Sequence, residues 1–212
     1  MDIPVDEPLH FFDWHSELSI KRNNLPHWHQ RGRVQFVTFR LADSLPSVKL
    51  QQLAEFKAKW VEEHPFPWDE LEWMEYNEII ALKVDKWLDK GYGSCLLSKP
   101  SVRDVVVGAL YYYNNKLYRL FSFVVMPNHV HVILSPTGDN DVRSALGLVK
   151  SYSAKVINKM TGGTGPFWQK EVFDRIIRNV EKLDKFDKYI RNNPKGLSDN
   201  TYTLFTTREL SN

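Results

Sequence analysis

Two apolar segments lie almost back to back near the middle of the chain, and only two residues separate them. The first runs from Leu117 to Met126, and the second runs from His129 to Ser135. Both are rich in β-branched and aromatic side chains, which favour strands. The connecting residues Pro127 and Asn128 are typical of a tight turn. The pattern therefore predicts an antiparallel β-hairpin at the centre of the fold.

Helical and extended patterns alternate around this hairpin. We expect two further strands and five helices, at Val34–Leu41 and Phe173–Arg178 for the strands and at Val48–Glu62, Asp69–Lys90, Val102–Tyr113, Val142–Met160 and Glu181–Asn192 for the helices. Four strands with helices between them indicate an α+β protein, with an antiparallel sheet and helices packed on one face.

The chain of 212 residues is long enough for one domain with an insertion. Residues 1–30 are polar and lack periodicity, so we interpret them as an N-terminal arm. Residues 31–197 contain the predicted sheet, with a helical insertion at about 60–98, and residues 198–212 are interpreted as a C-terminal tail.

Composition places few limits on function. The formal net charge of +2 is too small to indicate a binding partner. Cys95 is the only cysteine, so an internal disulfide is impossible and a reducing compartment is favoured. The chain has neither a signal-peptide pattern nor the run of about 18 apolar residues that a membrane span needs. We expect a cytoplasmic protein without a membrane partner, and the oligomeric state stays open.

His129 and His131 lie one residue apart on the second predicted strand. Residues i and i+2 of a strand point to the same face, so the two imidazoles should converge. Such a pair can bind a divalent metal, although strand histidines can equally be hydrogen-bonded structural residues. A bound ion would need a third protein ligand and a substrate oxygen. The same spacing in His27–Trp28–His29 lies in a polar stretch and is interpreted as a loop.

The last predicted helix carries Tyr189 and Asn193 four residues apart, and therefore on one face. A tyrosine can attack phosphorus and hold the phosphoryl group covalently, and an asparagine oxygen can complete a metal shell. A tyrosine near a helix end can also simply pack its ring and expose its hydroxyl. Tyr152, which lies between Lys150 and Lys155, is the alternative nucleophile.

Four short motifs occur in a characteristic order, at Met126–His131, Gly165–Gln169, Phe173–Asn179 and Tyr189–Pro194. Together with the lead segment 25–46, they resemble the REP-associated tyrosine transposases, which are relatives of the IS200/IS605 transposases. The resemblance covers about residues 25–197. It implies a ferredoxin-like fold and makes residues 31–197 a catalytic domain of the single-tyrosine type.

The resemblance also implies a function and a set of site residues. It implies metal-dependent cleavage and rejoining of single-stranded DNA, at sites that contain hairpins, with Mg²⁺ or Mn²⁺ as cofactor. His129, His131 and Asn193 would match the metal ligands, and Tyr189 would match the nucleophile. The tyrosine would be linked to the 5′-phosphate of the DNA while a 3′-hydroxyl is released, and strand transfer would be the reverse attack.

Cations and aromatic rings after the hairpin are candidate DNA contacts, because single strands are held by cations along the backbone and rings under the bases. The candidates are Lys150, Lys155, Lys159, Lys170, Arg175, Arg178, Phe167 and Trp168. The lysines equally fit a solvated helix face, and Trp168 equally fits a core position.

Two other functions remain open at this point. The first is a nucleic-acid-binding protein on the same fold whose catalytic site has decayed. The second is a phosphoesterase with paired histidine motifs and no covalent step, which would need a second His-x-Thr/Ser motif that the sequence lacks.

Overall fold

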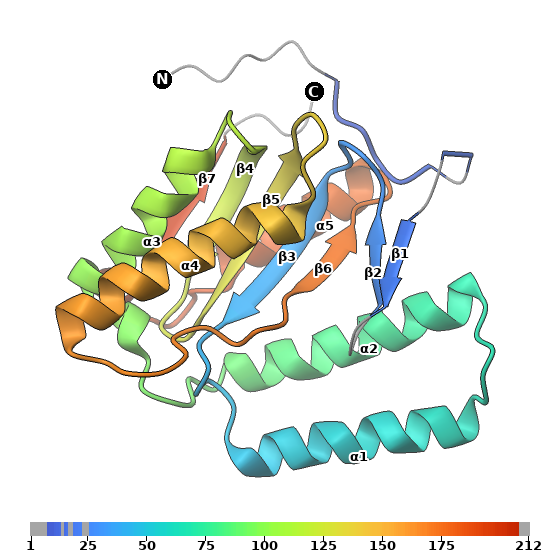
Figure 1. Ribbon diagram of the computed structural model, residues 1–212, viewed down its shortest axis with the longest axis horizontal. Helices are drawn as coiled ribbons and strands as arrows, with labels where there is room; N and C mark the ends of the chain where they lie inside the picture. Colours follow the sequence, from blue (N-terminus) through green and yellow to red (C-terminus); the bar gives the residue numbers. More distant parts are fainter. Residues whose placement is uncertain (1–7, 14, 17–18, 23–25, 208–212) are drawn as a thin grey trace.

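The computed structural model describes residues 8–13, 15–16, 19–22 and 26–207 (Figure 1). A five-stranded antiparallel sheet lies at its centre, in the order β6-β3-β5-β4-β7. Its strands are β3 (Gln35–Arg40), β4 (Tyr118–Val125), β5 (His129–Pro136), β6 (Phe173–Ile176) and β7 (Thr203–Thr206). The hairpin expected from the sequence is β4–β5, and it occupies the middle of the sheet.

The connections of the central strands follow the ferredoxin-like pattern, in which two β-α-β units are interleaved. Helix α3 (Pro100–Tyr113) precedes β4, and α4 (Val142–Thr161) joins β5 to β6. Both helices pack on one face of the sheet, where Val106 of α3 and Val149 of α4 share a cluster with Val130 and Val132 of β5. The α+β class and the antiparallel sheet are therefore confirmed.

The opposite face of the sheet is covered by α5 (Val180–Asn192), so the expectation of helices on one face alone is corrected. Leu183 and Ile190 of α5 pack there against Phe36 and Ile133. The physical reason is that the central strands are apolar on both sides. Strands buried on both faces need a cover on each, and α5 supplies the second one.

A helical hairpin formed by α1 (Ser47–Glu63) and α2 (Glu70–Leu88) lies beside one end of the sheet (Figure 1). Its own aromatic cluster includes Trp60, Trp68 and Tyr76. Asp69 begins α2 with a capping box, in which it exchanges hydrogen bonds with Glu72. This hairpin begins earlier than the insertion expected at about 60–98.

The ends of the described chain also carry strands. Strands β1 (Ser19–Arg22) and β2 (Pro26–His29) form a separate two-stranded sheet. The segment His27–Trp28–His29 is therefore a strand and not the loop that we expected. The polar sequence of these two strands does not predict a strand, because backbone pairing between them stabilises the extended conformation rather than an alternation of apolar side chains. Within the predicted tail, η2 (Asp199–Thr201) leads into β7, which pairs with β4. The division into arm, domain and tail remains a prediction.

Candidate active site

The two histidines of β5 point to the face that α5 covers. Val130 and Val132, which alternate with them, belong to the cluster beneath α3 and α4, whereas Ile133 belongs to the cluster beneath α5. Both histidines are fully buried, and their Nε2 atoms lie 3.0 Å apart. The strand spacing therefore brings the two imidazoles together as the sequence predicted.

Hydrogen bonds to the other ring nitrogen orient each imidazole. Asn128 Nδ2 donates to the carbonyl oxygens of Leu88 and Tyr92, which turns Asn128 Oδ1 toward His129 Nδ1 at 2.7 Å. The hydroxyl of Thr38 lies 2.8 Å from His131 Nδ1. Because Nδ1 is engaged in both rings, the Nε2 atoms are directed at their shared point.

Burial also determines the charge state of the two rings. It lowers the pKa of His129 to about 3, and it lowers the pKa of His131 well below its ordinary value. Desolvation penalises the charged imidazolium form, so both rings are neutral at physiological pH. A neutral imidazole is the form that binds a metal ion.

Helix α5 delivers Tyr189 and Asn193 to the same point. The hydroxyl oxygen of Tyr189 lies 3.5 Å from His131 Nε2, and the two ring centroids are 5.1 Å apart. Asn193 caps the C-terminal end of α5, one turn after the tyrosine. Burial, together with the charges of Asp85 and Asp89, raises the pKa of Tyr189, which keeps its phenol protonated.

The four groups have the composition of a site for a divalent cation. The Oδ1 atom of Asn193 is buried and has no hydrogen-bond partner. Two adjacent ligands of an octahedral ion, each at about 2.1 Å, are separated by about 3.0 Å, which is the distance between the two Nε2 atoms. Among the described residues, no group of three His, Cys, Asp or Glu side chains is arranged to hold a metal.

Helix α2 brings to this site two carboxylates that no sequence motif had indicated. Asp85 is buried and lies 3.4 Å from the guanidinium of Arg175, and burial raises the pKa of Asp85 to about 7. Asp89 accepts a hydrogen bond from Asn193 Nδ2. Only their spacing of four residues on a predicted helix could have pointed to a shared face.

Two of the predicted DNA contacts, Lys150 and Trp168, instead interact with other parts of the protein itself. Lys150 Nζ donates to the carbonyl oxygens of Gln169 and Lys170, each at 2.8 Å, and burial lowers its pKa to about 8. Trp168 is buried against Phe39, and its Nε1 atom donates to Ser153 Oγ at 2.9 Å.

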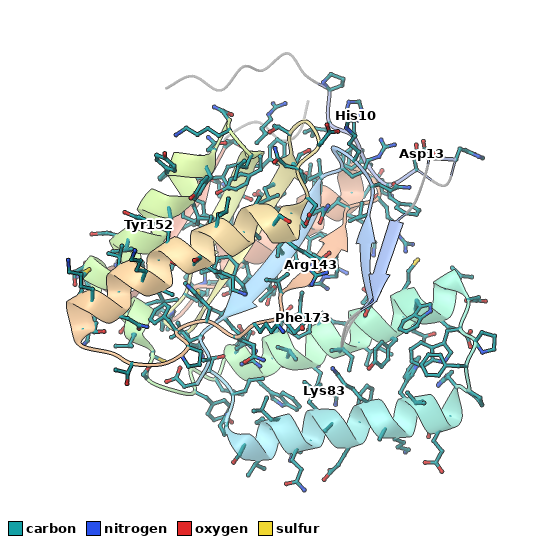
Figure 2. All side chains as sticks on the ribbon, viewed as in Figure 1. His10, Asp13, Lys83, Arg143, Tyr152 and Phe173 are labelled. Atoms are coloured by element: carbon teal, nitrogen blue, oxygen red, sulfur yellow. The ribbon has the colours of Figure 1, made fainter. Side chains whose placement is uncertain are left out.

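The other predicted residues differ in exposure. The side chain of Arg175 is largely enclosed, and its guanidinium lies 4.9 Å from the ring centroid of Phe36. Arg178 and Lys155 are exposed. Tyr152 is 53% exposed on α4 (Figure 2). Helix α4 packs on the opposite face of the sheet from the histidines. The structure therefore brings Tyr189, and not Tyr152, to the histidine pair.

Part of the chain that includes the candidate site is similar to a known protein family. Residues 102–193 match the family model of IS200-like transposases, which confirms the predicted resemblance over that segment. The segment contains all four residues of the candidate site, whereas α1 and α2 lie outside it. No curated protein matches the chain.

Among solved structures, a REP-associated tyrosine transposase bound to a REP hairpin is similar, with 16% sequence identity and a TM-score of 0.45. The similarity covers 80% of this chain and 70% of that one. In the described part of this chain, no helix is both long enough and apolar enough to cross a membrane.

Proposed function

We propose that this protein is a single-tyrosine transposase or nuclease that cleaves and rejoins single-stranded DNA at sites containing hairpins. The observation that carries the proposal is the meeting of Tyr189 and Asn193 from α5 with His129 and His131 from β5. The match of residues 102–193 to the family model of IS200-like transposases supports the proposal.

In the proposed reaction, the hydroxyl oxygen of Tyr189 attacks a phosphorus atom of the DNA backbone. A bond forms between tyrosine and the 5′-phosphate while the bond from phosphorus to the 3′ oxygen breaks. The proton that the phenol loses is balanced by the proton that the released 3′-hydroxyl gains. Rejoining is the same exchange in reverse, with a 3′-hydroxyl as the attacking group.

The residues around the tyrosine have defined tasks in this proposal. His129, His131 and Asn193 would hold Mg²⁺ or Mn²⁺, which when bound would polarise the scissile phosphate and stabilise charge on the leaving oxygen. Thr38 and Asn128 keep the imidazoles oriented. The ring of Phe36 packs edge-on against Tyr189, which limits the positions that the phenol can take.

The outer face of α5 is suited to a nucleic-acid backbone. It exposes three lysines at intervals of three residues, Lys182, Lys185 and Lys188, and Lys195 is exposed in the turn that follows the helix. Cations that follow a groove or helix attract phosphates without regard to sequence. We propose that the bound strand crosses this face of α5 on its way to Tyr189.

The proposal is tested by incubating the protein with labelled hairpin DNA and Mn²⁺. We expect a protein–DNA adduct that survives denaturant in the native protein and in the Tyr152→Phe variant. The Tyr189→Phe variant should bind DNA and form no adduct. Binding without any adduct in the native protein would indicate a binding protein instead, and cleavage without an adduct would indicate a phosphoesterase.

A further inference from the structure

A cavity of about 290 Å³ lies between α2, β6 and α5, beside the candidate active site. Its walls include Leu71, Met74 and Asn77 of α2, Ile176 of β6 and Phe186 of α5. Its volume is close to the lower end of the range of about 300–1,000 Å³ that is typical of small-ligand pockets. The function proposed above uses one residue of the lining, Lys182, and assigns no ligand to the cavity itself.

The cavity lies next to the reacting tyrosine. Phe186, which lines it, precedes Tyr189 by three residues on α5, so the two lie on one helix face about 4.5 Å apart along the axis. Phe186 also stacks on Phe36, with ring centroids 4.5 Å apart, and Phe36 in turn stacks on His131. A ligand in the cavity would therefore contact Phe186, which is linked to His131 of the site by ring stacking through Phe36.

The lining combines rings with an even balance of charge. Three carboxylates face it from Glu75, Glu78 and Asp174, and three cations face it from Arg175, Arg178 and Lys182. A phosphate would favour an excess of positive charge, and a purely apolar ligand would favour no charge. Donors and acceptors beside aromatic rings suit a flat, neutral group with a polar edge, such as a nucleobase.

Arg178 is available to such a ligand. Its guanidinium contacts Met74 Sδ and lies 6.0 Å from the ring centroid of Phe12, and both a thioether and an aromatic face are weak partners. The carbonyl oxygen or ring nitrogen of a base is a stronger acceptor for a guanidinium than sulfur is. Asn77, on the opposing wall, carries both a donor and an acceptor for the same polar edge.

We propose that this cavity takes up one unstacked nucleobase of the bound single strand, close to the nucleotide that Tyr189 attacks. The inference rests on the proposed function, because it assumes that single-stranded DNA reaches α5. Binding of this base fixes the position of the strand along α5, and therefore determines which phosphate lies beside Tyr189. Because α2 forms one wall, the helical hairpin takes part in choosing the cleavage position.

The test uses the Tyr189→Phe protein, which should bind DNA without cutting it, and fluorescence anisotropy. Every nucleotide of the single-stranded flank of a hairpin DNA is replaced in turn by an abasic residue. We expect one position at which the replacement weakens binding about tenfold, as loss of one stacked base would. The added double substitution Asn77→Ala and Arg178→Ala should abolish that penalty. The added control substitution Lys116→Ala, at an exposed lysine before β4, should leave the penalty intact.

Two results would overturn the inference. One is an affinity that no abasic position changes selectively, and the other is a penalty that persists undiminished in the Asn77→Ala and Arg178→Ala protein. Circular dichroism of each variant excludes unfolding as the cause of a loss. Failure of the proposed function is seen separately, as the absence of an adduct with native protein and intact DNA.

Discussion

Asn193 donates a hydrogen bond from Nδ2 to Asp89 Oδ1 at 3.4 Å, although the two residues are 104 positions apart in the sequence. The contact joins the C-terminal cap of α5 to the C-terminal cap of α2. The side chain of Asn193 also interacts with the ring of His129, so it lies between Asp89 and the histidine pair. The helical hairpin thus orients Asn193, although the hairpin lies outside residues 102–193, which match the family model.

Replacing Asp89 should therefore weaken metal binding. In Asp89→Ala the amide of Asn193 loses its orienting partner, and we expect Mn²⁺ affinity to fall about tenfold, as it does when outer hydrogen bonds of metal ligands are removed. Isothermal titration of Mn²⁺ into the protein measures this directly. The matched control is Asp104→Ala, which removes an exposed carboxylate from α3. Equal affinities in the two variants would contradict the role assigned to Asp89.

Thr38→Val should act on the same site through His131. The substitution preserves shape but removes the hydroxyl that lies 2.8 Å from His131 Nδ1, so a buried ring nitrogen loses its partner. We expect a loss of Mn²⁺ affinity of about tenfold and a free energy of unfolding lower by about 1–3 kcal/mol. Urea denaturation with and without Mn²⁺ separates the two effects. A variant that binds Mn²⁺ like the native protein would contradict the proposed ligand set.

Asp85 should make stability depend on pH. Because burial raises its pKa from 3.8 to about 7, the folded state binds more protons than the unfolded state between these values. Its contribution to the free energy of unfolding is therefore highest below about pH 4, falls as pH rises through this window, and is level above pH 7.

The Asp85→Asn variant removes the titrating group and should not show this fall. Compared with the native protein, it should gain stability between pH 5 and pH 8, as measured by urea denaturation at several pH values. The exposed Asp104→Asn change serves as the control. Parallel stability curves for native protein and Asp85→Asn would show that Asp85 does not titrate in this window.

The lysines of α5 should govern the salt dependence of DNA binding. Lys185 and Lys188 are exposed on the helix that carries Tyr189. If each contacts one phosphate, the Lys185→Ala and Lys188→Ala double variant should weaken binding similarly for all sequences. It should also reduce the slope of log affinity against log salt by about 1.4 for a single strand. Anisotropy titrations from 50 to 300 mM salt measure the slope. The same pair of changes at Lys59 on α1 and Lys116 before β4, which are also exposed, should leave the slope unaltered.

Local periodicity was enough to predict much of this protein. Alternation along His129–Val132 put both imidazoles on one face, and the four-residue spacing put Tyr189 and Asn193 on one side of a helix. Both predictions depend only on the repeat of a strand or a helix. The order of strands and helices was likewise sufficient for the α+β class, because strands interspersed with helices can bury their apolar faces in few layered arrangements.

Tertiary packing decided the rest, because it depends on contacts between distant segments that no local pattern encodes. Periodicity could not say that α5 covers the opposite face from α4, which unites Tyr189 with the histidines and separates Tyr152 from them. It could not say that Trp168 is buried or that Lys150 binds backbone carbonyls. The approach of Asp89 to Asn193 likewise exists only because the folded chain places the ends of α2 and α5 side by side.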